Sequence, residues 1–167
     1  MKRAHTRTFA AVAAITAAAA IAAGPAQAAK SNMTFTLGNQ SSPISSYSWG
    51  ATNSGSATSG GGAGAGKVSV QDFDMVKDTD AMSVRLARAV FTGQHAPTAA
   101  LTFNNGIFTT AYCFEDVLVS SFHNSASSSQ DRPVDQVSLT FAKIGFQVGT
   151  DTFNWDIASN KSPDSPC

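Results

Sequence analysis

The chain has 167 residues, with 11 Lys and Arg, 11 Asp and Glu and three His, and its formal net charge is zero. This length favours a single domain that is large enough to bury a hydrophobic core. Three of the basic residues lie among the first seven positions, so the remainder is mildly acidic, which argues against nucleic acid as a partner.

Residues 1–28 have the pattern of a secretory signal peptide. A positive start, an apolar run and a small-x-small cleavage pattern follow one another in Lys2, Arg3 and Arg7, residues 9–23, and Ala26-Gln27-Ala28. Gly24-Pro25 stops the apolar run before it could comfortably span a bilayer. An N-terminal helix packed on the domain is the alternative, but the Ala-rich run has no polar face for water. We therefore predict cleavage after Ala28, a secreted or periplasmic protein, and no stable membrane insertion.

The mature chain is dominated by short stretches in which apolar and polar residues alternate. They lie in residues 33–37, 68–70, 101–103, 107–122 and 134–148. A period of two indicates strands that are buried on one face. Residues 107–122 are long enough for two strands or one bent strand. In residues 134–148 the alternation changes phase, and a bulge near Ala142-Lys143 would reconcile the two halves.

One segment departs from the β pattern. Between Asp80 and Gly93 the apolar residues Met82, Leu86, Ala89 and Val90 follow helical spacing. Asp80 or Thr79 can cap the start, and Gly93 followed by Pro97 ends the helix. The Gly- and Ser-rich residues 54–66 and the polar residues 124–132 are expected to be loops. Together these elements predict a mainly β fold, a small antiparallel β-barrel or sandwich with one flanking α-helix.

The sequence offers little catalytic or ligand-binding machinery. The histidines are His5, His95 and His123, and no serine lies in a G-x-S-x-G turn. The carboxylates of residues 72–80 lack the glycine and terminal glutamate of a calcium loop. The Gly run of residues 60–64 precedes a strand and has no Lys-Ser or Lys-Thr pair, so flexibility explains it better than phosphate binding. We therefore predict no enzyme activity, no metal and no cofactor.

Six motifs occur in an order that resembles the haemolysin-coregulated (Hcp) family of type VI secretion. They are Ser46-x-Ser48-Trp49-Gly50, Gly66-Lys67-Val68 to Asp72-Phe73, Thr92-Gly93-Gln94-His95, Phe114-Glu115-Asp116-Val117, Val137-Ser138-Leu139 to Lys143-Ile144, and Trp155-Asp156. The likeness covers residues 44–157. The residues that carry the family motifs are Trp49, Gly50, Asp72, Phe73, Gly93, His95, Glu115, Asp116, Lys143, Trp155 and Asp156.

The resemblance implies a small β-barrel with a flanking helix that assembles as a hexameric ring. In the family such rings stack into a tube that is expelled and can carry effectors, so a secreted effector or a secretion-apparatus protein is an expected partner. It implies no catalysis. The chain differs from the family pattern in its signal peptide and in the short segment 29–43 before the first motif.

We expect four regions: the signal peptide 1–28, a short strand segment 29–43, the Hcp-like domain 44–157 and a polar tail 158–167 without packing of its own. The first hypothesis is an exported, non-enzymatic, ring-forming Hcp-like protein. The alternative is a monomeric secreted binding module or effector that keeps the fold without tube assembly. The oligomeric state distinguishes the two.

Cys113 and Cys167 are the only cysteines. Export to an oxidising compartment makes a disulfide between them plausible. Two alternatives stay open, namely a bridge between subunits, and a buried apolar Cys113 with an unpaired Cys167.

Overall fold

The computed structural model describes residues 32–55 and 66–163. The predicted signal peptide, the Gly run 60–64 and Cys167 lie outside these residues. The elements in chain order are β1 (Met33–Leu37), β2 (Gln40–Pro43), β3 (Ser46–Ser48), β4 (Ala51–Asn53), β5 (Val68–Val70), β6 (Phe73–Asp78), α1 (Ala81–Thr92), β7 (Ala96–Asn104), β8 (Thr109–Ser125), β9 (Val134–Thr140), β10 (Lys143–Val148) and β11 (Asp151–Asp156). In this part of the chain no helix is long and apolar enough to cross a membrane.

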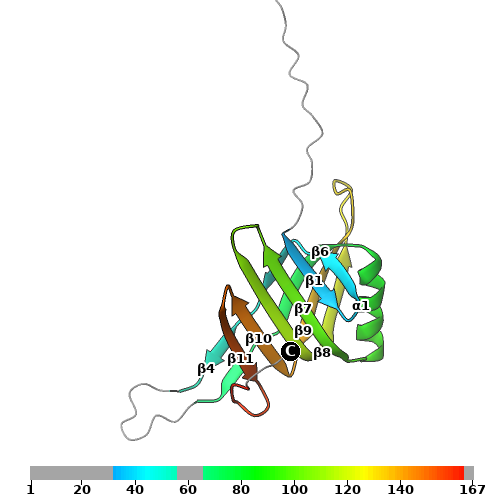
Figure 1. The fold of residues 1–167 in the computed structure, drawn as a ribbon. Helices are drawn as coiled ribbons and strands as arrows, with labels where there is room; N and C mark the ends of the chain where they lie inside the picture. Colours follow the sequence, from blue (N-terminus) through cyan, green and yellow to red (C-terminus); the bar gives the residue numbers. More distant parts are fainter. Residues whose placement is uncertain (1–31, 56–65, 164–167) are drawn as a thin grey trace, which may run out of the picture.

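The long strand β8 organises the sheet, which is antiparallel throughout and mainly β as predicted (Figure 1). The first half of β8 pairs with β7 on one side and with β10 on the other. Its second half pairs with β9, and a register shift between Val119 and Ser121 separates the two halves. This bulge bends the strand, so the sheet curls round its own core.

The curled sheet comes close to closing on itself. Its main strand order is β2-β1-β7-β8-β9-β6-β3, with β2 and β3 at the two ends, and β10 branches from β8 and carries β11 as a further edge. Strands β2 and β3 are consecutive in the chain and are joined only by Ile44 and Ser45, whose amides donate to Met33 of β1 and to Val76 of β6. The architecture is therefore an open barrel of sandwich type, and the edges β2 and β3 keep unpaired sides.

The core fills the inside of this sheet. Phe73 lies at its centre, stacked on Tyr47 at 5.5 Å and tilted against Phe114 at 4.9 Å between ring centroids. Phe35, Leu101 and Leu139 are also fully buried. Burying one such side chain contributes about 1.5–3 kcal/mol relative to leaving it exposed. Period-two alternation in the strands is what directs these residues to one face.

Helix α1 covers part of this core, and its bounds and cap agree with the sequence prediction. The Asp80 side chain accepts a hydrogen bond from the Met82 amide, and Ser83 completes a capping box. Met82 and Leu86 are buried on the face of the helix that packs on the sheet. The helix ends at Gly93, which takes the left-handed conformation, φ 62°, that glycine adopts without steric cost.

The predicted bulge near Ala142-Lys143 is wrong. The phase change in residues 134–148 separates two different strands, β9 and β10, and Phe141 and Ala142 form the connection between them. The two strands pair with different halves of β8, so each keeps its own inward phase. A register shift lies instead in β8, between Val119 and Ser121, where the inward positions change phase from Val119 to Phe122.

Three boundaries also differ from the prediction. Ile107 and Phe108, expected in a strand, lie in the turn before β8. The strand β8 continues to Ser125, into the expected loop. The tail packs where it begins, because Lys161 forms a bridge with Asp156 and the Pro163 carbonyl accepts a hydrogen bond from Asn154.

Candidate functional site

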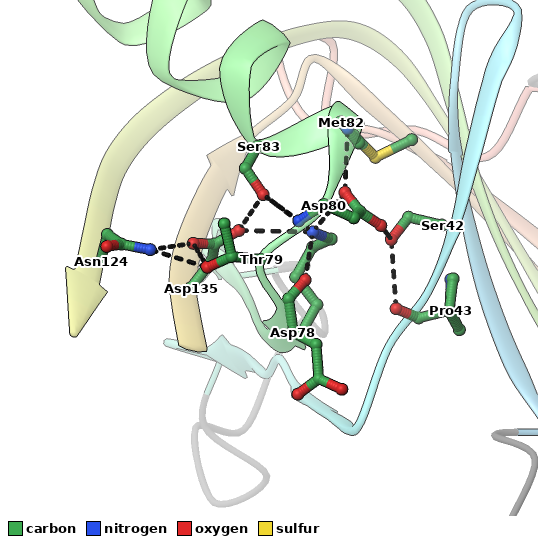
Figure 2. A network of polar contacts seen from close by, with 10 residues as sticks. Ser42, Pro43, Asp78, Thr79, Asp80, Met82, Ser83, Asn124 and Asp135 are labelled. Atoms are coloured by element: carbon green, nitrogen blue, oxygen red, sulfur yellow. Dashed lines mark hydrogen bonds and ion pairs between the residues drawn. The ribbon is translucent and has the colours of Figure 1, made fainter. Parts of the chain in front are cut away.

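A buried polar network lies under the first turn of α1 (Figure 2). The Lys77 side chain is 0% exposed, and its Nζ donates to Asp80 Oδ1 at 2.7 Å, to Asp135 Oδ2 at 3.3 Å and to Ser83 Oγ at 3.1 Å. A fourth bond, at 2.7 Å, reaches the Asp78 carbonyl. The network thus joins β6, β9 and the helix start around one cation.

The carboxylates of this network accept hydrogen bonds from side chains on several elements. Asp135, which is 0% exposed, accepts from Ser83 Oγ, from Thr79 Oγ1 at 2.9 Å and from Asn124 Nδ2 at 2.7 Å. Asp80 accepts from Ser42 Oγ of β2. Buried polar groups normally need such complete pairing, since an unpaired one costs much of its hydration.

The pKa values of both aspartates follow from this pairing. Burial by itself would raise the pKa of Asp135, but hydrogen bonds from Ser83, Asn124 and Thr79, followed by that from Lys77, lower it below the ordinary value. Burial also opposes the shift at Asp80, where bonds from Lys77 and Ser42 and the Lys77 charge lower the pKa. Both carboxyl groups are thus held in the ionised form.

The network does not have the properties of a catalytic centre. A Lys beside a Ser is a known way to activate a nucleophile. Here Ser83 is buried, its hydroxyl donates to Asp135, and its oxygen accepts from the Asp80 amide at 2.9 Å and from Lys77. The hydroxyl is neither accessible nor free to attack. The network therefore positions the helix on the sheet.

A second polar cluster gathers family-motif residues at the end of the sheet where β7 begins and β11 ends. Lys143 Nζ lies 2.8 Å from Glu115 Oε2, and His95 Nδ1 lies 2.6 Å from Asp116 Oδ1. Asp156 is the strand partner of Lys143. We call these five residues the barrel-end cluster. They come from four of the six motifs, and His95 lies in the turn after α1.

This cluster is open to solvent. The His95 and Asp116 side chains are more than half exposed, and those of Lys143 and Glu115 about a third. The hydrogen bond and the charge of Glu115 raise the pKa of Lys143, and the Ser159 amide lowers the pKa of Asp156 despite the opposing effect of burial. Asp116 has a left-handed backbone, φ 50°, one residue before the last pair of β8 with β7, which joins Val117 and Ala96. These charges are available to a partner.

The other motif residues serve the fold in different ways. Asp72 and Asp74 are exposed and accept from Ser120 Oγ at 2.8 Å and from Ser138 Oγ, while Phe73 between them points into the core. The Gly50 carbonyl accepts from the Gln71 amide at 2.8 Å, so the chain crosses from β3 to the β4–β5 hairpin there. These positions do not join the barrel-end cluster.

An aromatic pocket of about 330 Å³ lies between the β4–β5 hairpin and the β10–β11 hairpin. Its lining is mostly apolar, and we call it the arm pocket. The residues are Trp49, Ala51, Thr52, Asn53, Val68, Val70, Ile144, Phe153 and Trp155. Trp49 and Trp155 pack against the core, and both also line this pocket. Nothing in the sequence pattern indicated that they would leave a cavity.

Sequence reasoning missed the buried network, although a signal was present. Lys77 follows Phe73 and Met75 on the inward phase of β6, and Asp135 precedes Val137 and Leu139 on the inward phase of β9. A charge on an inward position requires an opposite charge nearby. The register between β6 and β9 pairs Lys77 with Asp135 directly.

Cys113 lies on β8. Among residues 32–55 and 66–163 there is no free cysteine. Cys167 lies outside those residues, so its predicted pairing stays a prediction. Within the same ranges no group of three or more His, Cys, Asp or Glu side chains is placed to hold a metal ion.

Comparison with known proteins connects this geometry to a family. The family model described as "Type VI secretion system effector, Hcp" matches residues 36–148, which include β1 to β10 almost completely. The chain belongs to the Hcp family. The match includes the barrel-end cluster except Asp156, as well as the buried network.

Relatives of this Hcp protein agree in sequence and in fold. Protein hcp1 of Pseudomonas aeruginosa is 38% identical over 83 residues, which are 47% of this chain and 51% of that protein. The match thus spans about half the length of the curated relative. A solved type six secretion system protein superposes with a TM-score of 0.69 at 24% identity, covering 78% of this chain and 98% of the other.

A third comparison is the crystal structure of Hcp1 from Salmonella typhimurium. Its TM-score is 0.67 at 23% identity, over 78% of this chain and 97% of that chain. At this level of identity the likeness concerns the fold. The mainly β fold with one helix, and the resemblance from which it was expected, are therefore confirmed.

Proposed function

We propose that this Hcp-family protein is an exported, non-enzymatic subunit that assembles into hexameric rings and serves as a tube or carrier component of type VI secretion. The observation that carries the proposal is the family match over residues 36–148. The expected partners are further copies of the chain, and a secreted effector or secretion-apparatus protein.

The unpaired strand edges and the outer face of α1 support ring assembly. Phe91 is 89% exposed and Val84 is also exposed on this helix face. The edge strand β2 lies beside the helix, since the two elements are in contact. Apolar side chains next to an open sheet edge are suited to bury surface on a neighbouring subunit. In a ring such a contact joins two different faces of adjacent copies.

The proposal includes export through the signal peptide and processing after Ala28. The pattern of Lys2, Arg3 and Arg7, the apolar run and the small residues Ala26 and Ala28 supports it. We expect Ala29 as the mature N-terminus, which intact-mass measurement of the exported protein determines. A mass that still includes Met1 to Ala28 would contradict this part of the proposal.

A disulfide between Cys113 and Cys167 is the second structural part of the proposal. It would close a loop of about 54 residues, which the chain-entropy model values at roughly 4 kcal/mol. It would also tie the tail to the barrel wall. Thiol counting with non-reducing electrophoresis tests it. No free thiol and a monomer band agree with the internal bridge, a covalent ladder indicates bridges between subunits, and two titratable thiols would contradict both.

Light scattering coupled to size-exclusion chromatography tests the ring. We expect six times the subunit mass for the mature protein, and a loss of this species in Phe91→Glu but not in Phe91→Leu. Ile107→Glu, which changes an equally exposed residue far from the helix, is the matched control and should leave the mass unchanged. A monomer at high micromolar concentration would contradict the ring and favour the monomeric binding module.

A further inference from the structure

An open hollow of about 390 Å³ lies between the outer face of α1 and the start of β2. The described residues that line it are Gln40, Ala81, Val84, Arg85, Arg88 and Gln94. Two of these side chains are cationic, two are neutral amides and none is a carboxylate. The hollow therefore offers positive charge and hydrogen-bond donors, and it belongs neither to the buried network nor to the barrel-end cluster.

Arg85 is held in place by the turn between β1 and β2. Its Nη1 donates to Asn39 Oδ1 at 2.9 Å. Gly38 in the same turn has a left-handed backbone, φ 61°, and a Cβ at this position would lie 2.8 Å from Arg85 Nη2. Glycine is the residue that fits both this conformation and this space. The guanidinium is thus positioned before any ligand binds, which reduces the ordering cost of binding.

The charges of Arg85 and Arg88 are not compensated within the described part of the fold. None of the ion pairs within residues 32–55 and 66–163 includes either arginine. The first turn of α1 has no acidic residue. Like charges on adjacent turns of a helix repel each other, so this pair does not favour the helix. Two neighbouring arginines without a carboxylate partner are suited to an external anion.

A phosphate group matches this pair of arginines better than a carboxylate does. A carboxylate has one charge and two oxygens, which a single planar guanidinium can satisfy through two parallel hydrogen bonds. A phosphate monoester has a charge of about −1.5 to −2 at pH 7 and three acceptor oxygens, so it can engage both guanidinium groups. The side-chain amides of Gln40 and Gln94 can donate to the same oxygens.

We propose that Arg85 and Arg88 bind a phosphate group, either inorganic phosphate or the phosphate of a small monoester. Arg85 holds the group from its fixed position, and the exposed Arg88 completes the site one turn further along α1. Ala81 and Val84, which are also exposed, would contact the organic part of an ester. All these residues belong to one chain, so the inference goes beyond the proposed function and does not depend on ring assembly.

Isothermal titration calorimetry of the mature protein at low ionic strength tests the site, with inorganic phosphate, phenyl phosphate and acetate as the probes. We expect both phosphates to bind at one site per chain, and acetate to bind weaker by about tenfold or more. Tighter binding of phenyl phosphate would identify an ester as the ligand, and equal binding would identify the free ion. Either result supports the site. Absence of phosphate binding, or acetate binding of equal strength, would overturn the inference.

Charge-removing variants locate the binding in the hollow. Arg85→Gln and Arg88→Gln should each weaken phosphate binding by about tenfold or more, because each removes charge-assisted hydrogen bonds. The matched control is Lys67→Gln, which removes the same charge from an exposed residue just before β5, a strand whose partner β4 lies away from α1 (Figure 1). It should keep the wild-type affinity. Equal losses in the control and in the arginine variants would overturn the site.

Asn39→Asp tests the positioning of Arg85 without removing an arginine. It places a carboxylate beside the guanidinium, which we expect to compete with phosphate and to weaken its binding by about tenfold, while the unfolding midpoint does not fall. Unchanged phosphate affinity in Asn39→Asp would overturn the role given to Arg85. Light scattering on the same samples separates this inference from the ring. A monomer that binds phosphate would support the site and contradict the ring, and a ring that binds none would do the reverse.

Discussion

The buried network beneath α1 and the barrel-end cluster use the same chemistry in different surroundings. In both, a lysine Nζ lies 2.7 to 3.3 Å from carboxylate oxygens. Lys77 and Asp135 are fully buried, whereas the cluster residues are partly or mostly exposed. Removing one member of a buried pair leaves an uncompensated charge, while an exposed pair is screened by water. The first group therefore contributes more to the stability of the fold than the second.

The largest expected effect is at Lys77. Lys77→Met leaves the Asp135 carboxylate buried without its cation, and we expect a loss of about 3–5 kcal/mol in the free energy of unfolding. Chemical denaturation of the mature protein measures it. The matched control is Lys143→Met in the barrel-end cluster. We expect this variant to lower the free energy of unfolding far less.

The double variant Lys77→Met/Asp135→Leu sharpens the comparison. If the loss in Lys77→Met comes from the stranded charge, removing that charge as well should restore part of the stability. Equal losses in Lys77→Met and Lys143→Met would show that burial does not distinguish the two regions.

The next effect concerns the core under the helix. Leu86→Ala should lower the free energy of unfolding by roughly 2 to 4 kcal/mol, because a fully buried Leu is truncated. The control Val84→Ala, on the exposed face of the same helix, should change it by less than about 0.5 kcal/mol. A loss below that limit in Leu86→Ala would mean that the buried face of α1 is not the one identified.

A smaller effect is expected from acid. The folded-state pKa values of Asp80 and Asp135 are lowered, so their contribution to stability is complete above the ordinary carboxyl pKa of about 4 and is lost as the pH falls through the lower folded values. Unfolding midpoints measured at decreasing pH should fall in this acidic range. Asp80→Asn should reduce the dependence of the unfolding midpoint on pH. An unchanged dependence would exclude Asp80 as a cause of the acid destabilisation.

The smallest effect is expected at His95. Its pairing with Asp116 is exposed, and such pairs contribute little. His95→Gln should leave the unfolding curve within experimental scatter. A clear destabilisation would show that the barrel-end cluster also supports the fold.

The comparison also separates what the sequence can predict from what it cannot. Local signals were sufficient for α1, since Asp80, Gly93 and the spacing of Met82 and Leu86 define its ends and its buried face. The inward phase of Phe73 was likewise predictable. The partners of β8 were not, because one strand pairs with three others and its own alternation does not say which strands lie beside it.

The candidate site shows the same division. The motif residues His95, Glu115, Asp116, Lys143 and Asp156 were identified singly, but their meeting depends on the register that pairs β8 with β10 and β10 with β11. The arm pocket depends on how the β4–β5 hairpin lies against β11, which no local pattern encodes. Tertiary register, rather than residue type, is what sequence reasoning lacked.

The central claim is that this Hcp-family chain builds rings from the faces that its fold leaves open. Negative-stain electron microscopy of the purified mature protein tests this claim most directly. We expect class averages of closed six-membered rings with a central opening, which disappear in Phe91→Glu and persist in Phe91→Leu. Uniform particles of the size of one subunit, at concentrations where the protein is folded, would contradict it.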